Sequence, residues 1–301
     1  MTENSGFKSG FISIVGSPNV GKSTLMNTFV GQKVAIVSSR PQTTRNRIMG
    51  VMTRPDCQIV FLDTPGIHTP KNKLGQYMVK VAYDALNEVD GILFMTDATM
   101  GIRQRDEGIL AQLKKAKAPV VAAVNKIDAA GKDKVAAMLD RLRMESWLNA
   151  AMPISAATGE GLFELEEKLR SFLVPGPKYF PDDMVTDQPE RVLCAEMVRE
   201  KALILLKEEV PHGLGVDIEK MHTRENGLVD IYATIYCERE SHKAIVIGKR
   251  GAMLKEIGQR ARAEMEWMLG AKVNLQLWVK VKEDWRNQPA ALRMLGYQDE
   301  N

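Results

Sequence analysis

The stretch Gly16-Ser-Pro-Asn-Val-Gly-Lys-Ser23 decides the fold of the first half of this chain. It directly follows the apolar run Phe11–Val15 and precedes a segment with apolar residues at helical spacing. A glycine-rich turn between a strand and a helix directs backbone N–H groups at a polyphosphate, with the lysine on the β- and γ-phosphates and the serine on Mg²⁺. The pattern therefore predicts a nucleoside triphosphate site formed by Gly16, Ser17, Pro18, Asn19, Val20, Gly21, Lys22, Ser23 and Thr24.

Length and composition indicate an ordinary globular protein of about two domains. The chain has 301 residues, 45% of them hydrophobic and 26% charged, with a formal net charge of +3. It contains no uninterrupted apolar run of about 18 residues and begins with a polar segment, so we expect neither a transmembrane helix nor a secretory signal. Cys57, Cys194 and Cys237 lie far apart, which predicts reduced thiols rather than a disulfide framework or a zinc site.

Short apolar runs alternate with amphipathic segments over residues 1–175, which we assign to one α/β domain. Helical patterns cover residues 71–88 and 104–115, between strands expected at 11–15, 58–63, 91–97, 120–125 and near 153–154. This alternation is typical of a mostly parallel, six-stranded sheet with helices on both faces. Ligands of such folds bind at the carboxyl ends of the strands, where the polar motifs of this chain occur.

Which base the nucleoside triphosphate carries is predicted from Asn125-Lys-Ile-Asp128, a motif that follows an apolar strand. The Asp128 carboxylate can accept hydrogen bonds from N1–H and the exocyclic amine of guanine, a donor pair that adenine lacks. Lys126 would pack over the base and brace the phosphate loop. Ser155 and Ala156 follow the next short strand, where the Ala156 N–H can reach guanine O6.

A second group of residues is expected around the γ-phosphate. In Asp63-Thr64-Pro65-Gly66, the aspartate is placed to bind Mg²⁺ and the Gly66 N–H to bind the phosphate. In Arg40-Pro-Gln-Thr-Thr-Arg45, we favour Thr44 over Thr43 as a further Mg²⁺ ligand, because its place before Arg45 matches a G-x-T-R pattern. Lys22, Thr44, Asp63, Gly66 and Asn19 are the residues to which we assign catalytic roles.

Residues 176–190 are rich in proline and acidic residues and predict a linker to a second domain, 191–285, followed by a tail, 286–301. This domain has the order helix, strand, strand, helix pair, strand. Gly248-Lys249-Arg250-Gly251 lies between the helices of the pair, and residues 239–262 carry a local charge of +5. A G-x-x-G loop in this order is typical of a type II KH module, which clamps about four single-stranded nucleotides. We expect RNA contacts from this loop and from Ile245, Ile247 and Lys255, in a groove completed by Ile257 and the strand 231–235.

The five nucleotide motifs together resemble those of the small GTPase fold, and the forms G-x-P-N-V-G-K-S, Q-T-T-R and D-T-P-G resemble the Era branch of bacterial translation-associated GTPases. The resemblance covers essentially the whole chain. It implies slow GTP hydrolysis to GDP, with switch segments near 34–48 and 66–75. Ile67 occupies the position where many GTPases place a water-orienting glutamine, so no catalytic base can be named. Related GTPases hold K⁺ with an asparagine at the position of Asn19, which implies stimulation by K⁺.

The resemblance also implies the partner and location. The RNA would be the 3′ end of 16S ribosomal RNA, bound during assembly of the 30S subunit by a cytoplasmic monomer that can associate peripherally with the inner membrane. An alternative reading is a membrane-associated or cell-cycle signalling GTPase whose C-terminal domain binds proteins. A third, an RNA-modifying enzyme regulated by GTP, needs a second catalytic site, and residues 191–301 show no catalytic constellation.

Overall fold

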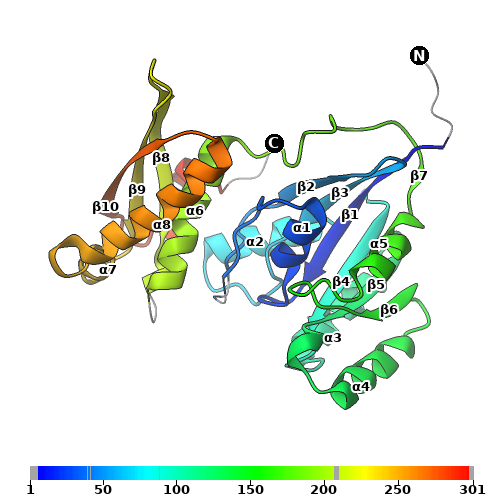
Figure 1. Cartoon of the computed structure of the whole chain (residues 1–301). Helices are drawn as coiled ribbons and strands as arrows, with labels where there is room; N and C mark the ends of the chain where they lie inside the picture. Colours follow the sequence, from blue (N-terminus) through cyan, green and yellow to red (C-terminus); the bar gives the residue numbers. More distant parts are fainter. Residues whose placement is uncertain (1–5, 39, 41, 88, 207–209, 298–301) are drawn as a thin grey trace. The chain divides into compact units, whose positions relative to one another are not determined.

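The computed structural model describes residues 6–38, 40, 42–87, 89–206 and 210–297 and divides into two compact units (Figure 1). The first comprises residues 1–35, 44–69 and 78–187; the second comprises 36–43, 70–77 and 188–301. Several predictions fall outside the described residues: the polar N-terminal segment 1–5, Pro41 of the Arg40–Arg45 motif, the helix end at Glu88, and residues 298–301 of the tail.

The first unit is built on one twisted sheet, as the alternating pattern predicts. The strand order is β2-β3-β1-β4-β5-β6, parallel except that β2 runs antiparallel to β3; a two-residue strand, β7, pairs antiparallel with β1. The strands are β1 (Lys8–Gly16), β2 (Ile48–Thr53), β3 (Cys57–Asp63), β4 (Gly91–Asp97), β5 (Val120–Asn125), β6 (Ala150–Pro153) and β7 (Val174–Pro175).

Helices cover both faces of this sheet, because its central strands are apolar on both sides. One core layer joins α1 and α5 to the sheet through Leu25, Phe61 and Leu165, while α2, α3 and α4 pack on the other face around Phe94. The helices of this unit are α1 (Lys22–Val30), α2 (Lys73–Asp84), α3 (Gln104–Leu113), η1 (Ile127–Ala129), α4 (Lys132–Arg143) and α5 (Leu162–Arg170). Residues 73–77 of α2 are grouped with the second unit.

The predicted linker follows the first unit closely. The Gln58 side chain accepts the N–H groups of Tyr179 and Phe180, at 2.8 and 3.0 Å, and donates to the Phe180 carbonyl at 2.9 Å. Farther along, the Val51 N–H on β2 donates to the Val185 carbonyl at 2.9 Å. The linker up to residue 187 is therefore held along the β2–β3 side of the sheet rather than hanging loose.

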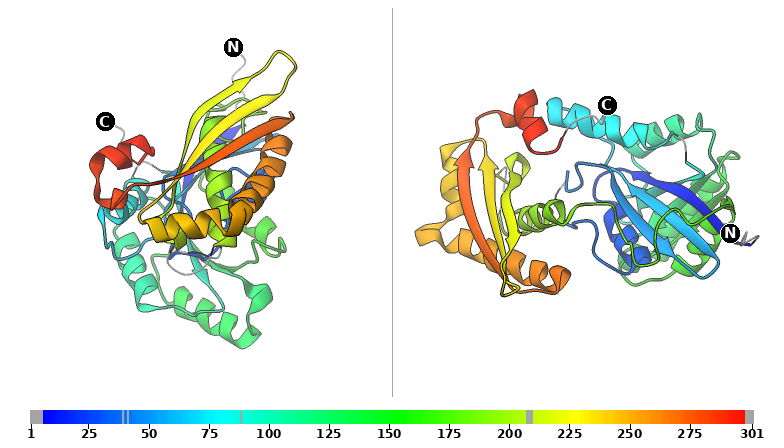
Figure 2. Two further views of the ribbon diagram at one scale, coloured as in Figure 1. Left: turned by 90° about the vertical axis from the view of Figure 1, so that its left-hand side faces the viewer. Right: turned by 90° about the horizontal axis from the view of Figure 1, so that it is seen from above.

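The second unit consists of a three-stranded sheet with helices packed on one side (Figure 2). Its strand order is β10-β9-β8, so that β9 is central and β10 lies at an edge, parallel to β9. The helix pair and loop occur in the predicted order, and the tail forms a short helix. The elements are α6 (Glu190–Leu205), η2 (Val210–Gly213), β8 (Gly215–Thr223), β9 (Val229–Cys237), α7 (Glu240–Ile247), η3 (Lys249–Gly251), α8 (Ala252–Leu269), β10 (Val273–Val281), η4 (Trp285–Asn287) and α9 (Pro289–Met294).

The two tryptophans near the C-terminus differ in environment. Trp285 is fully buried and donates its indole N–H to the Gly213 carbonyl at 2.8 Å, which anchors the tail to this unit. Trp278 on β10 is 42% exposed. Trp285 therefore belongs to the packed interior, whereas Trp278 lies on the face of the sheet opposite the helices.

Asp230 on β9 is expected to make the stability of this unit depend on pH. Its carboxylate accepts from Arg224 at 2.6 Å and from Asn274 at 2.7 Å, and these bonds lower its pKa from 3.8 to about 2. Because the folded-state pKa is depressed, the stabilisation from Asp230 is complete above about pH 4 and is lost as the pH falls toward 2.

We therefore expect Asp230→Asn to lower the unfolding midpoint at pH 7, with the difference from the parent chain narrowing between pH 4 and 2. Thermal unfolding followed by circular dichroism measures both effects. Glu225→Gln, an exposed change in the same hairpin, is the matched control. An equal offset at every pH would contradict this assignment.

Candidate functional site

The phosphate loop lies between β1 and α1, as its sequence predicts, and its lysine is buried. Lys22 is 6% exposed, and its ammonium donates to the carbonyls of Gly16 and Ser17 at 3.3 and 3.2 Å. Burial lowers the pKa of Lys22, while the nearby Asp63 carboxylate opposes the shift. A buried ammonium group has lost its hydration, and a bound anion with several charges would compensate that cost.

Three predicted Mg²⁺ ligands meet beside this lysine. Ser23 Oγ donates to Asp63 Oδ2 at 2.6 Å and lies 3.0 Å from Thr44 Oγ1, which is 3.4 Å from the same carboxylate oxygen. The other oxygen, Asp63 Oδ1, is buried and has no hydrogen-bond partner among the described residues. Burial raises the pKa of Asp63, and Lys22 only partly offsets this shift. Three side chains with oxygen ligands, one of which has an oxygen without a hydrogen-bond partner among the described residues, fit a hard divalent cation such as Mg²⁺.

The geometry also distinguishes the two neighbouring threonines. Thr43 Oγ1 lies 2.7 Å from Ser38 Oγ and donates to the Arg40 carbonyl at 2.7 Å, so this hydroxyl serves the local turn. Thr44 Oγ1 faces Ser23 and Asp63 instead. This arrangement favours Thr44 over Thr43 as the third ligand.

Gly66 passes directly against the phosphate loop. A Cβ atom at this position would lie 2.7 Å from the backbone of Pro18, so only glycine allows this approach. The preceding Thr64 is turned away, with its hydroxyl donating to the Ile14 carbonyl at 2.8 Å. Ile67 is 7% exposed and packs in the core, which leaves this position without a side chain able to orient water.

The residues predicted to recognise guanine come from two loops. Asn125 donates to the Val20 carbonyl at 2.8 Å and Lys126 to the Asn19 carbonyl at 2.7 Å, which ties the base pocket to the phosphate loop. Ser155 Oγ donates to Asp128 Oδ1 at 2.6 Å and thereby orients the carboxylate. The Ala156 N–H, which is predicted to reach guanine O6, donates to Asn125 Oδ1 at 2.9 Å in this structure.

Sequence reasoning missed two aspartates that support this site. Asp97, at the end of β4, accepts from Lys126 at 2.6 Å. Burial alone would raise the pKa of Asp97, but the bonds from Lys126 and Thr99 hold it below its ordinary value. Asp106, fully buried in α3, accepts from Ser17 Oγ at 2.6 Å. Asp97 could have been found from its position at the end of a predicted strand. Asp106 could not, because it lies 89 residues from Ser17 in the sequence and no local pattern links the two.

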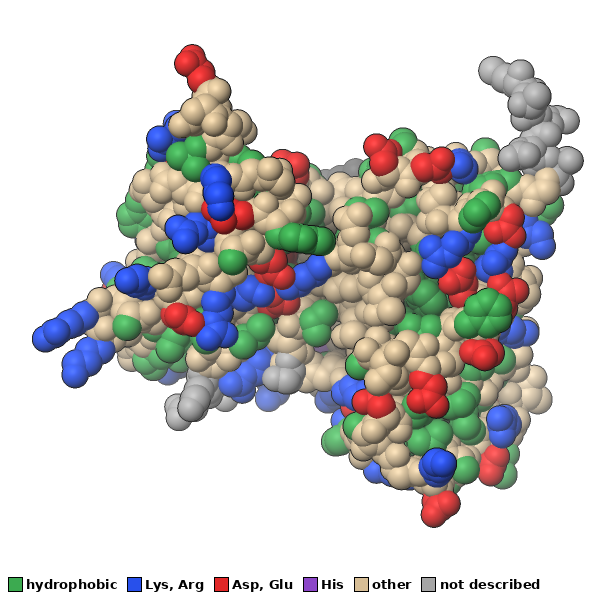
Figure 3. Space-filling view, viewed as in Figure 1, with side chains coloured by type: hydrophobic (Ala, Val, Ile, Leu, Met, Phe, Trp, Pro, Cys, Tyr) green, Lys and Arg blue, Asp and Glu red, His purple; other side chains and the backbone are tan. Residues whose placement is uncertain are grey.

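The G-x-x-G loop forms a tight, exposed corner between α7 and α8. Gly248 has a φ of 71°, and a Cβ atom there would lie 2.7 Å from that of Met253, so a side chain is excluded on both grounds. Lys249 and Arg250 are exposed, and Figure 3 shows basic side chains projecting from this end of the unit. The loop thus presents two cations next to a backbone that a phosphate can approach closely.

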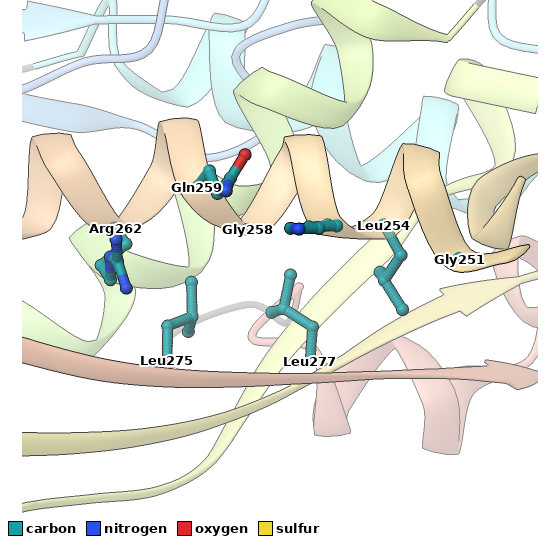
Figure 4. Close-up of a pocket in the computed structure, with 8 residues that line it drawn as sticks. Gly251, Leu254, Gly258, Gln259, Arg262, Leu275 and Leu277 are labelled. Carbon is teal, nitrogen blue, oxygen red and sulfur yellow. The ribbon is translucent and has the colours of Figure 1, made fainter.

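A groove of about 440 Å³ runs from this loop along α8 (Figure 4). Its other wall is the edge strand β10, which contributes Leu275 and Leu277. The expected wall of Ile257 and strand 231–235 is wrong: Ile257, Ile231 and Ile235 are fully buried in the core, because β9 is the central strand. The lining residues are Gly251, Leu254, Lys255, Gly258, Gln259, Arg262, Leu275 and Leu277.

Of the other predicted RNA contacts, Lys255 lines this groove, and Ile245 on α7 is 48% exposed. Ile247 is half-buried at the end of α7. Gln259 and Arg262 were not predicted, although one and two helical turns beyond Lys255 they share its face of α8. The groove therefore combines an apolar floor with polar and cationic side chains along its rim.

Comparisons with known proteins match a segment of each domain to a family. Residues 11–126 match the family described as 50S ribosome-binding GTPase, and residues 209–286 match the KH domain. The GTPase Era of Ruminiclostridium cellulolyticum is 52% identical over 291 residues, which covers 97% of this chain and 98% of that protein. The GTPase Era of Clostridioides difficile is 53% identical over 295 residues, covering 97% and 99%.

Two solved structures are similar over nearly the whole length. A crystal structure of Era in complex with MgGDPNP and nucleotides 1506–1542 of 16S ribosomal RNA has a TM-score of 0.94 and 46% identity, and covers 97% of this chain and 100% of that one. A crystal structure of a substituted Aquifex aeolicus Era bound to GDP and AlF4⁻ has a TM-score of 0.92 and 44% identity, with the same coverage.

Proposed function

This chain belongs to the Era family of GTPases, and from that premise we propose that it binds the 3′ region of 16S ribosomal RNA and acts in assembly of the 30S subunit. We assign 1–175 to the GTPase domain, 176–190 to the linker, 191–285 to the KH domain and 286–301 to the tail. The observation that carries the proposal is the groove beside Gly248–Gly251, whose cationic loop and apolar floor suit single-stranded RNA.

GTP hydrolysis is the activity of this family, and we propose how the residues of this chain divide the work. Lys22 and the loop amides stabilise charge on the β- and γ-phosphates, and Asp128 selects guanine. Ser23, Thr44 and Asp63 would hold Mg²⁺, which supplies charge neutralisation when bound. Gly66 brings its N–H to the γ-phosphate. Because Ile67 orients no water, we expect slow intrinsic turnover and a switching role, with residues near 34–48 and 66–75 responding to the γ-phosphate.

We further propose that K⁺ supports hydrolysis at Asn19. This residue is exposed on the phosphate loop, and its carbonyl accepts the Lys126 ammonium, so its position is tied to the base pocket. A monovalent cation there would add positive charge where an arginine acts in other GTPases. We expect faster turnover in KCl than in NaCl, and the loss of that difference in Asn19→Ala. Turnover that is the same in both salts, in both proteins, would refute the proposal.

The location follows from the partner. Because ribosomal RNA resides in the bacterial cytoplasm, we place the protein there, with additional peripheral contact on the cytoplasmic face of the inner membrane. We propose that it acts as a monomer. Among the described residues, no helix is long and apolar enough to cross a bilayer. Fractionation of cells with and without a high-salt wash separates ribosome-bound from membrane-bound protein.

The RNA partner is tested by crosslinking the GTP-bound chain to total cellular RNA and sequencing the crosslinked sites. We expect the sites to concentrate near the 3′ end of 16S ribosomal RNA. The variant Lys249→Glu with Arg250→Glu should lose them. Crosslinks spread evenly over unrelated RNAs, or unchanged in the variant, would reject the proposal.

A further inference from the structure

The face of the KH sheet opposite its helices carries a ladder of three aromatic rings. His222 on β8 stacks on Tyr232 of β9, with ring centroids 6.3 Å apart and planes 9° from parallel. Tyr232 in turn stacks on Trp278 of β10, at 6.0 Å and 11°. These separations are typical of offset-stacked aromatic rings. The ladder therefore crosses all three strands and ends at the edge strand.

The last ring of the ladder is open to solvent. Trp278 is 42% exposed, and among the residues that the structure describes, Tyr232 is the one ring in contact with it. The neighbours of Trp278 on the same face of β10, Gln276 and Lys280, are exposed as well. A planar aromatic ligand that stacked on this exposed ring would extend the ladder by one more layer.

The edge strand joins this face to the RNA groove. Side chains alternate along a strand, so Leu275 and Leu277 of β10 point into the groove while Trp278 points to the opposite face. Because β10 is an edge, no further strand separates the two surfaces. An RNA strand that leaves the groove can therefore cross the edge strand β10 and reach the exposed indole of Trp278 on its other face.

The charges of this face suit a polyanion. The acidic groups described on this face all have partners: Arg224 and Asn274 bond Asp230, Lys280 bonds Glu219 at 2.8 Å, and Arg191 lies 3.8 Å from Asp217, which pairs in register with Thr234. Lys220, paired in register with Tyr232, is exposed and has no ion-pair partner in the part of the chain that the structure describes. Cations next to stacked rings are the composition with which proteins bind unpaired nucleotides.

We propose that the His222–Tyr232–Trp278 ladder is a second RNA contact, which stacks an unpaired base of the same RNA beyond the nucleotides held in the groove. The inference rests on the proposed function and extends it. A G-x-x-G loop clamps about four nucleotides, whereas the RNA in the related complex spans nucleotides 1506–1542. Most of such an RNA needs surface outside the groove, and the ladder is the aromatic surface closest to its edge strand.

The test compares Trp278→Leu with Trp267→Leu in the full chain. Trp267 is 70% exposed on α8 and is the matched control. The probes are a single-stranded RNA of about four nucleotides, which fills only the groove, and an RNA of nucleotides 1506–1542. We expect Trp278→Leu to weaken binding of the long RNA about five- to a hundredfold, the effect of losing one stacked base. The short RNA should bind unchanged, and Trp278→Phe should restore affinity for the long one.

Equal affinity of Trp278→Leu and the parent chain for the long RNA would overturn the inference, and so would equal weakening with both probes, which indicates that the ring only supports the fold. Selective loss of a protein partner with RNA binding intact would assign the face to that partner instead. If the parent chain binds neither RNA, the proposed function itself fails, so the two failures are distinguishable.

Discussion

Replacing Asp128 by alanine is expected to weaken GTP and GDP binding by at least about 100-fold, because two charge-assisted hydrogen bonds to guanine are lost. The Ser155 hydroxyl donates to Asp128 Oδ1 at 2.6 Å and fixes the orientation of the carboxylate. The alanine variant therefore loses both oriented acceptor oxygens. Asp128→Asn should do more than weaken binding. Its amide offers an NH2 donor group and a carbonyl acceptor, which complement the carbonyl that xanthine has in place of the guanine amine and its neighbouring N1–H.

The preference of Asp128→Asn should therefore move from GDP toward XDP, measured by equilibrium titration with fluorescent nucleotides. Asp133→Asn, an exposed change on α4, is the control and should bind GDP as the parent does. If Asp128→Ala kept its GDP affinity within about twofold, the difference expected of an uncoupled site, guanine would have to be read elsewhere. The ATP and XTP affinities of the same variants show whether base selectivity or only binding strength has changed.

The second large effect is expected at the loop between α7 and α8. Changing Lys249 and Arg250 together to glutamate should weaken RNA binding by at least about 100-fold, because two phosphate contacts are replaced by repulsion. The salt dependence of the remaining binding should become shallower for the same reason. GTP affinity should stay within about twofold, as for distant, independent sites.

The matched control for that variant is Lys114→Glu with Lys115→Glu, which reverses two adjacent exposed charges at the end of α3. It changes the net charge equally but lies outside the KH domain. Filter binding or fluorescence anisotropy over a salt series measures both variants. Equal losses in the two would mean that RNA senses only the overall charge, and the assignment of the loop would be wrong.

The nucleotide half of the fold could be predicted from sequence, because the phosphate loop, Asp63–Gly66 and Asn125–Asp128 each follow a mainly apolar strand. The runs ending at Asp63 and Asn125 specify buried strands, and parallel strands bring their carboxyl ends to one edge. The hydrogen bond from Ser17 to Asp106 could not be predicted from sequence, because it depends on where α3 packs against the sheet. Local patterns identify elements, whereas such long-range contacts follow from their arrangement.

The RNA half shows the same limit more sharply. Alternation along residues 231–237 correctly indicates that one face of β9 is apolar. It does not reveal that β10 pairs beside β9 and takes the edge position, which leaves Ile231 and Ile235 in the core. The order of the strands decides which residues line the groove, and the alternation of apolar residues along one strand does not reveal that order.

The bonds between the linker and β2 have a consequence for the synthesis of the chain. β2 is the outermost strand of its sheet, and an uncovered edge strand offers unpaired N–H and carbonyl groups to other chains. The bond from Val51 to Val185, and that from Thr186 Oγ1 to the Met49 carbonyl at 2.7 Å, occupy part of that edge. Domains fold from the N-terminus as they emerge from the ribosome. The edge therefore stays open to aggregation until Thr186 has emerged, and a chain truncated at residue 175 should aggregate more readily than one ending at 187.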